Sequence, residues 1–196
     1  MQNHTQLPAR LSFSYETERL ILRLPSTDYA PEILDFLCRN RSCFQKYEPT
    51  APENYYTLDL QQSLARYELK LALKLSSVRF YVFLKEDPST IIGTVCLHDI
   101  IKMPYFSSEL GYKFDASYHH HGYAREALSK VLAIGFYDLG LHRIFGRCMP
   151  ENVPSRKLLA VTGFFEEGIE RGSILIQGKW EDHIRYAILN PGDVHS

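Results

Sequence analysis

One stretch of the sequence combines residue types that could hold an anion. It reads Tyr-His-His-His-Gly-Tyr-Ala-Arg-Glu-Ala-Leu over residues 118–128 and passes from an extended segment, through a loop with the single glycine Gly122, into an amphipathic helix. A loop of this kind can aim several backbone N–H groups at one point, and the helix start behind it adds roughly half a positive charge. The stretch therefore predicts a binding site for a small anionic group.

The three consecutive histidines His119, His120 and His121 also invite comparison with metal sites. Adjacent side chains rarely converge on one ion, and no cysteine or carboxylate stands beside them at a ligand spacing. We therefore expect no metal in this loop.

The composition is that of an ordinary globular protein, with 45% hydrophobic and 23% charged residues in a chain of 196. This length is sufficient for one domain with a sizeable core. The net charge of −1 and the lack of a basic stripe in the sequence argue against a nucleic-acid partner.

The four cysteines have no CxxC spacing, which indicates reduced thiols in a reducing compartment. No apolar run approaches the roughly 18 residues needed to span a membrane. Residues 1–6 lack the basic and apolar regions of a secretion signal. We expect a cytoplasmic protein that does not associate with membranes.

Hydrophobic periodicity predicts the elements that must position the 118–128 stretch. Strands are predicted over residues 19–24, 79–85, 91–98, 107–114, 143–149, 164–170 and 180–188, and helices over about 26–40, 57–75, 123–140 and 152–163. The second helix is expected to face the core through the stripe Leu60, Leu64, Tyr67, Leu71 and Leu75. This order indicates a single α/β (α+β) domain over residues 1–196, with a mixed sheet, helices on both faces, and tails at 1–14 and 191–196.

Two connections and one glycine stand out from this pattern. Residues 41–56 form a long loop with three tyrosines, which is expected either to pack over the core or to form the wall of a site. The connection 99–106 has apolar residues near its tip, which fit contact with a substrate or partner and fit simple packing equally well. Gly93, inside a predicted strand, indicates a bulge or a close approach.

Four motifs in this order resemble the GCN5-related N-acetyltransferase (GNAT) superfamily, and within it the RimJ/RimL-like N-terminal acetyltransferases. ETERLILR (16–23) is similar to their first strand, and SSELGYKF (107–114) to their fourth. HHHGYAREAL (119–128) is similar to their pyrophosphate loop and third helix. PENVPSRKLLAVTGFFEEG (150–168) is similar to their N-x-x-S helix and the strand after it. The resemblance covers roughly residues 15–190, which are therefore the expected acetyltransferase domain.

The resemblance implies a GNAT fold, in which one central, mostly antiparallel mixed sheet of about seven strands has its fourth and fifth strands splayed apart. It implies acetyl-CoA as the acetyl donor, with its pantetheine arm along the fourth strand and its pyrophosphate in the loop. The cofactor-binding residues implied are Leu110, Gly111, Tyr112, Lys113, Phe114, His119, His121, Gly122, Tyr123, Ala124, Arg125, Asn152 and Ser155. Gly122 and Ala124 match the family's small residues, whereas His119 replaces a usual Gln or Arg and His120 replaces a frequent glycine.

The implied chemistry is acyl transfer to an amine, which must lose a proton before or during its attack. Glu109, on the fourth strand beside the splay, is the candidate general base, and an ordinary exposed strand glutamate is the alternative interpretation. Ser155 is the candidate acid because the N-x-x-S spacing places its hydroxyl in the first turn of a helix, although it could be a simple helix-start serine. Many members use a tyrosine later in this helix, and residues 157–161 contain none.

The predicted function is therefore an acetyl-CoA-dependent N-acetyltransferase that modifies a primary amine, such as the N-terminus of a ribosomal or other protein. A small-molecule amine is the alternative acceptor. A second hypothesis is a non-catalytic module that binds acyl-CoA without transferring the acyl group. The protein is expected to be a monomer or a homodimer.

Overall fold

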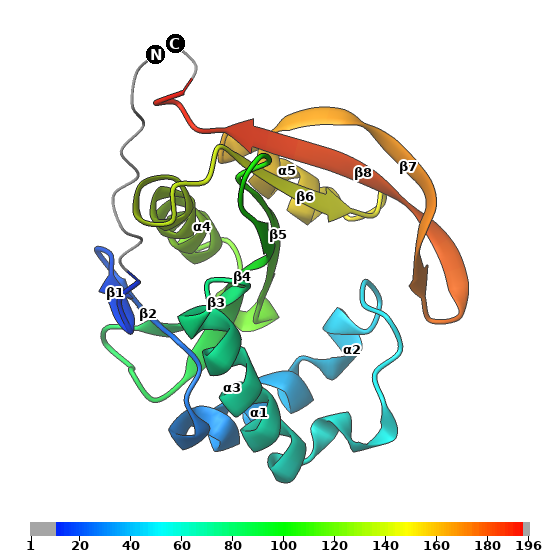
Figure 1. The fold of residues 1–196 in the computed structure, drawn as a ribbon. Helices are drawn as coiled ribbons and strands as arrows, with labels where there is room; N and C mark the ends of the chain where they lie inside the picture. The colour runs from blue at the N-terminus through cyan, green and yellow to red at the C-terminus, as the bar shows by residue number, and fades with distance from the viewer. Residues whose placement is uncertain (1–10, 194–196) are drawn as a thin grey trace.

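The computed structural model describes residues 11–193, which contain an eight-stranded sheet in the order β1-β2-β3-β4-β5-β6-β8-β7 (Figure 1). The strands are β1 (Ser14–Glu16), β2 (Leu20–Arg23), β3 (Val78–Leu84), β4 (Ile91–Ile101), β5 (Ser107–Phe114), β6 (Arg143–Cys148), β7 (Phe165–Ile176) and β8 (Lys179–Leu189). Every neighbouring pair is antiparallel except β5 and β6, which are parallel. The prediction of a mixed, mostly antiparallel sheet is confirmed.

Helices cover both faces of the sheet, as predicted (Figure 1). One face carries η1 (Thr27–Tyr29), α1 (Ala30–Arg39), α2 (Arg41–Phe44), η2 (Glu53–Tyr56) and α3 (Leu58–Leu73). The other carries α4 (Tyr123–Ala133), its continuation η4 (Ile134–Asp138) and α5 (Val153–Val161), while η3 (Ala116–Tyr118) precedes α4. Among residues 11–193, no helix has both the length and the apolar character needed to cross a membrane.

Strand β3 shows how one sheet supports two hydrophobic cores. Phe80 and Val82 belong to the core that includes α4, whereas Tyr81 and Phe83 belong to the core beneath α1. Successive side chains of a strand point to opposite faces. A strand covered on both sides is therefore apolar at nearly every position, and the run Phe-Tyr-Val-Phe-Leu has this composition.

The sheet has one strand more than predicted, because the short β1 pairs with β2. The predicted tails lie largely outside the described residues, and their inner part contributes Ser14 to β1. The loop 41–56 is also not irregular throughout, since it contains α2 and η2. The domain limits 15–190 stay a prediction.

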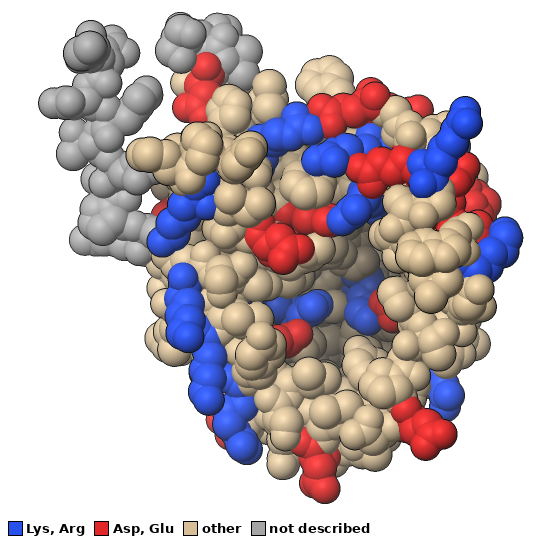
Figure 2. Space-filling model, turned by 45° about the vertical axis from the view of Figure 1, so that its right-hand side comes forward, with Lys and Arg blue, Asp and Glu red and all other residues tan. Residues whose placement is uncertain are grey.

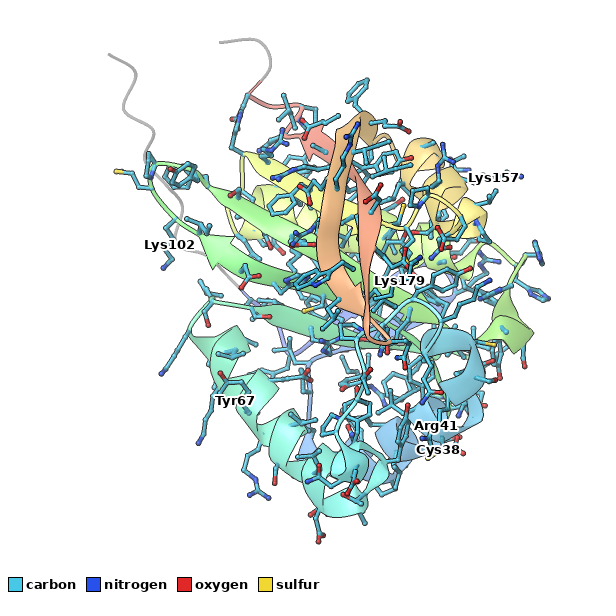
Figure 3. All side chains as sticks on the ribbon, turned by 90° about the vertical axis from the view of Figure 1, so that its right-hand side faces the viewer. Cys38, Arg41, Tyr67, Lys102, Lys157 and Lys179 are labelled. Atoms are coloured by element: carbon cyan, nitrogen blue, oxygen red, sulfur yellow. The ribbon has the colours of Figure 1, made fainter. Side chains whose placement is uncertain are left out.

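Helix α3 faces the core through smaller residues than the predicted leucine stripe. Gln61, Ala65 and Ala72 are its buried residues. Tyr67, which was expected to face the core, is 58% exposed and lies on the outer side of the helix (Figure 3). Small side chains let the helix approach the sheet closely, so the larger leucines are left at the margins of the contact. The predicted stripe is wrong at Tyr67 for this reason.

The β7–β8 hairpin is longer than predicted and curls from the edge of the sheet toward α2 (Figure 1). Its connection consists of Gln177 and Gly178, both at positive φ (45° and 81°), which is the backbone of a two-residue hairpin turn that follows the twist of its strands. Gly172, predicted to lie in the connection, is instead inside β7 where the register shifts.

Gly93 lies both at a bulge and at a close approach, the two features that a glycine inside a strand indicates. The β3–β4 register shifts beside it, and a methyl group at Gly93 would lie 2.3 Å from the ring of Phe114 on β5. The buried ring therefore needs a residue without a side chain opposite it.

We expect Gly93→Ala to destabilise the protein by about 1–3 kcal/mol, because a methyl group would overpack a filled core. Urea unfolding of the purified variant measures the change. The double variant with Phe114→Leu should regain part of the loss, since the smaller side chain makes room for the methyl group. Equal stability of Gly93→Ala and wild type would contradict this account of the contact.

Candidate active site

The predicted anion loop joins η3 to α4, and its backbone is shaped for close approach. Gly122 is the residue before the first turn of α4 and has φ of +81°, a conformation that favours glycine. His120 is also left-handed, with φ of +65°, at the position where many family members have glycine. The amides in the first turn of an α-helix have no partner within the helix, so those of Tyr123, Ala124 and Arg125 can donate to an anion.

Two of the loop histidines contact nearby backbone carbonyl groups. The ring Nε2 of His119 lies 3.2 Å from the carbonyl oxygen of Phe114, and Nδ1 of His121 lies 2.8 Å from the carbonyl oxygen of His119. The ring of His121 also stacks on Tyr123, with the ring centroids 5.6 Å apart. These contacts hold the loop in shape.

A clamp from the N-terminal segment fixes the start of α4. Glu126 accepts hydrogen bonds from Thr17 Oγ1 (2.6 Å), from the backbone amide of Arg19 (2.9 Å) and from Arg19 Nε (2.8 Å). Arg19 Nη1 also donates to the carbonyl oxygen of His121 (2.9 Å), and its guanidinium lies over the ring of Tyr123. Burial alone would raise the pKa of Glu126, but these hydrogen bonds outweigh it and hold the pKa below its ordinary value.

Strand β5 divides the predicted site between the two faces of the sheet. Leu110, Tyr112 and Phe114 pack with the core that includes α4 and α5, whereas Gly111 and Lys113 line a cavity, which Tyr112 also borders. Alternation along the strand places Glu109 on the same face as Gly111. The two candidate catalytic residues, Glu109 and Ser155, therefore lie on opposite sides of β5.

The ladder between β5 and β6 is short. It pairs Ser107, Ser108 and Glu109 with residues 143–145, although β5 continues to Phe114 and β6 to Cys148. From Leu110 onward, β5 therefore has no partner strand on that side. This leaves the β6 side of residues 110–114 without ladder bonds, beside the two candidate catalytic residues.

Glu109 is buried and is held by Arg147 on β6. Arg147 Nε donates to one carboxylate oxygen (2.8 Å), and Nη2 donates to the other. The contact begins an alternating series of ion pairs across β5, β6, β7 and β8, which we call the ion-pair chain. Its members, in order, are Glu109, Arg147, Glu170, Arg185, Glu167 and Arg143.

Ser155 lies in the first turn of α5, where Asn152 is the N-cap. The Asn152 side-chain oxygen accepts a hydrogen bond from the Ser155 amide (3.2 Å), as predicted for a cap at this position. The Ser155 hydroxyl lies 2.7 Å from the hydroxyl of Tyr112, which reaches it from β5. Burial raises the pKa of Tyr112, so its hydroxyl stays protonated at neutral pH and can donate a hydrogen bond to this pair.

A cavity of about 520 Å³ opens on the face of Gly111 and Lys113, and Figure 2 shows that this side of the molecule is hollowed. Its lining comes from α1, the loop 41–56, α3 and strands β3 to β5. The expectation that the loop 41–56 forms the wall of a site is supported, since Glu48, Pro49 and Tyr55 line the cavity. Burial raises the pKa of Tyr55 to about 12, so its hydroxyl is neutral.

Two contacts join the walls of the cavity. Lys113 Nζ pairs with Glu48 (2.6 Å), and Gln177, at the tip of the β7–β8 hairpin, donates to the backbone oxygen of Glu48 (3.0 Å). Deeper in the cavity, Arg79 Nε pairs with Glu68 (2.7 Å). The connection 99–106 contributes no lining residue within the described chain, and its Met103 is 78% exposed.

Several residues of the site were not foreseen from the sequence. These are Thr17, Arg19 and Glu126 of the clamp, Arg147 beside Glu109, and His98 on β4, which lies against Glu109 and Asp99. The motif ETERLILR predicts only a strand, yet its Thr17 and Arg19 hold the loop. An acidic residue in the first turn of α4 was the available signal for Glu126, but helix starts favour acidic residues in any case.

Comparison with known proteins agrees with this geometry. The family model of the acetyltransferase (GNAT) domain matches residues 19–164. The probable N-acetyltransferase YjcK of Bacillus subtilis is 36% identical over 165 residues, which cover 84% of this chain and 90% of that protein. The ribosomal protein uS5-alanine N-acetyltransferase of Escherichia coli is 28% identical over 176 residues, covering 89% of this chain and 90% of that protein. The structure of a ribosomal-protein-S5-alanine acetyltransferase from Vibrio fischeri is similar with a TM-score of 0.87 at 30% identity, covering 92% of this chain and 98% of that one.

We expect Glu126→Gln to lower the free energy of unfolding at pH 7 by about 1–2 kcal/mol, since hydrogen bonds to a charged group are lost or weakened. The pKa of Glu126 is lower in the folded than in the unfolded protein, so its stabilising charge is fully effective above the ordinary carboxyl range, near about 4.3, and is lost as the pH falls through the folded-state pKa. Urea unfolding of wild type and variant between pH 7 and about 3 should show a constant difference above about 4.3 and a shrinking one below it.

The matched control is Glu18→Gln, which removes the same charge from an exposed neighbour. It should stay within about 0.5 kcal/mol of wild type. A pH-independent difference for Glu126→Gln would count against the charged clamp.

Proposed function

Because the chain belongs to the GNAT acetyltransferase family and is an acetyl-CoA-dependent N-acetyltransferase, we propose that its acceptor is the α-amine at the N-terminus of a protein. The family establishes the donor and the reaction class. Membership also favours the enzyme over a non-catalytic acyl-CoA module. The identity of the amine and the roles of individual residues are the proposal.

For the donor, we propose the residues that the sequence suggested. The loop 119–125, with the N-terminus of α4 behind it, would hold the pyrophosphate, and the shape of Gly122 supports this fit, because a side chain there would be strained and would meet Arg19. The backbone of residues 110–114 would bind the pantetheine arm where the β5–β6 ladder is missing. Asn152 and Ser155 would complete this side.

Acetyl-CoA supplies a thioester, and the protein must manage the protons of the acceptor and of the departing thiol. We assign Glu109 to the acceptor side, where its carboxylate is buried and oriented by Arg147. We assign Ser155 to the thiol side, where Tyr112 can replenish its proton. Residues 157–161 of α5 contain no tyrosine, and Tyr112 of β5 supplies a tyrosine hydroxyl beside Ser155 instead.

The proton acceptors on this face favour an α-amine over a lysine. A free α-amine titrates near about 8, and a lysine amine near about 10.4. The groups beside Gly111 are carboxylates and an imidazole. Such groups remove a proton far more readily from an α-ammonium than from a lysine ammonium. This match between acceptor and available bases is the observation that carries the proposal.

The surface around the cavity supports a macromolecular acceptor. The ion-pair chain extends from Glu109 across β6, β7 and β8, and charged side chains alternate above the hollow in Figure 2. An extended N-terminal segment could lie along this polar face with its amine at Glu109. A small-molecule amine is the second candidate, which the volume of about 520 Å³ favours.

We also place the enzyme in a reducing compartment, the cytoplasm. All four cysteines are free thiols, and Cys38 and Cys43 are exposed, with Cys38 near Arg41 on the outside of α1 and α2 (Figure 3). We also propose that the protein is a monomer or a homodimer.

A peptide that begins with a free alanine and contains one lysine should release CoA thiol from acetyl-CoA in the presence of the enzyme. The same peptide with a blocked N-terminus should release none above background, because its only amine is the lysine. Thiol detection gives the rate, and mass spectrometry locates the acetyl group. Transfer to the lysine, or to benzylamine but to neither peptide, would contradict the proposed acceptor.

Ser155→Ala should lower kcat by about 100-fold with little change in KM for acetyl-CoA, because general acid catalysis typically contributes at least this much. Tyr112→Phe should lower kcat less, since it removes only the partner of Ser155. Steady-state kinetics with the free peptide measures both. The control Ser129→Ala, at an exposed position on α4, should equal wild type. Wild-type kcat for Ser155→Ala would refute the assignment.

A further inference from the structure

His98 is a titratable side chain on the acceptor face and lies outside the four sequence motifs. It lies on β4 directly opposite Glu109 of β5, and its backbone oxygen accepts a hydrogen bond from the Ser108 hydroxyl (2.7 Å). Its side chain is 38% exposed and lines the cavity. The backbone position is therefore fixed, while the ring has access both to the cavity and to solvent.

Asp99 sets the direction of the His98 ring. Ring Nδ1 lies 3.1 Å from Asp99 Oδ2, and Asp99 has φ of +52°, a left-handed conformation that aspartate tolerates better than most residues. An ionised carboxylate only accepts hydrogen bonds, so Nδ1 carries the hydrogen in this contact. The other nitrogen, Nε2, then keeps its lone pair, which is the arrangement of a general base oriented by an acid.

Nε2 lies at the strand that we propose for acetyl-CoA. A methyl group at Gly111 would come within 3.4 Å of Nε2, so glycine at this position leaves the nitrogen open to the cavity. A ring nitrogen of His98 and one oxygen each of Asp99 and Glu109 also lie within 4.8 Å of one another. Two hydrogen bonds of about 2.8 Å each through one water span such a distance.

We propose that His98 is a catalytic residue that accepts the proton of the acceptor ammonium, directly or through one water shared with Glu109. The proposal rests on the proposed function, because it requires an amine in this cavity. The proposal gives Glu109 and His98 different roles on the acceptor side. Glu109, held by Arg147, attracts and orients the ammonium, and His98 takes the proton.

The proton balance is complete with these groups. An ammonium that becomes an amide loses two protons, one of which leaves with the CoA thiol and the other enters solvent. In the proposed step an N–H bond of the ammonium breaks and an H–Nε2 bond forms, so the amine gains the lone pair that attacks the thioester. The imidazolium then releases its proton to solvent through the exposed part of the ring.

The charged groups around His98 suit a transient positive charge. Asp99 on its own strand and Glu109 on β5 both lie close to the ring. The guanidinium of Arg147, from β6, is engaged by Glu109, and Lys113 on β5 is engaged by Glu48. Arg79, which lines the same cavity from β3, is engaged by Glu68, so each of these three cations has a carboxylate partner.

The test uses the full-length enzyme, acetyl-CoA and the peptide with free N-terminal alanine. We expect His98→Gln to lower kcat by about 100-fold or more and to leave CoA binding by calorimetry unchanged. The acid limb of the wild-type kcat against pH should disappear in the variant. Added imidazole should restore activity to His98→Ala. Asp99→Asn, an exposed change that leaves the ring in place, should lower kcat by about 10-fold.

His142→Gln is the matched control, because His142 forms a similar contact with Asp193 (2.9 Å) outside the cavity. It should keep the wild-type rate and pH profile. Wild-type kcat and an unchanged acid limb in His98→Gln would overturn the assignment while leaving the acetyltransferase and its acceptor intact. Loss of wild-type activity with EDTA and recovery with a divalent cation would also overturn it, by making the same three side chains a metal site. A wild type that transfers nothing to the peptide instead overturns the acceptor itself.

Discussion

Parallel pairing between β5 and β6 lasts for only three residues, and the arrangement of the site depends on where it stops. Up to Glu109 the two strands are neighbours in one sheet, whereas beyond it each is paired on its outer side alone, β5 with β4 and β6 with β8. Backbone donors and acceptors that lose a strand partner need another one. A ligand that offers amide groups in an extended arrangement can satisfy them, which is why a strand-like cofactor arm fits a sheet that has been opened on one side.

The opening also lies beside the two residues proposed to transfer protons. Because side chains alternate along β5, Glu109 lies on the same face as Gly111, which lines the cavity, whereas the Tyr112 hydroxyl contacts Ser155 of α5. In the proposed mechanism, acceptor chemistry and thiol chemistry are thus assigned to opposite faces of one strand, with the reacting carbon expected between them. The clamp from Thr17 and Arg19 to Glu126 holds the third part, the anion loop, against the same sheet.

Local features of the site could be predicted from the sequence, and long-range ones could not. The Asn152 cap, the Gly122 turn and the Gly93 bulge each depend on the conformation of a few adjacent residues, and glycine or asparagine at such places has few alternatives. The contacts Arg147–Glu109, Tyr112–Ser155 and Lys113–Glu48 join residues 38, 43 and 65 positions apart. No periodicity specifies them, because each depends on which strands become neighbours. The α3 stripe failed for a related reason: burial followed the closeness of packing and not the size of the side chains.

The bridge between Gln177 and Glu48 joins segments 129 positions apart in the chain. Both are the tips of connections that project beyond the sheet, and neither belongs to the strand or the loop proposed to hold the donor. Substitutions at these tips can therefore reshape the entrance while the hydrophobic cores and the donor side stay unchanged. In the proposed arrangement, acceptor preference can diverge between lineages through substitutions at these tips, because they are distinct from the residues proposed to hold the donor.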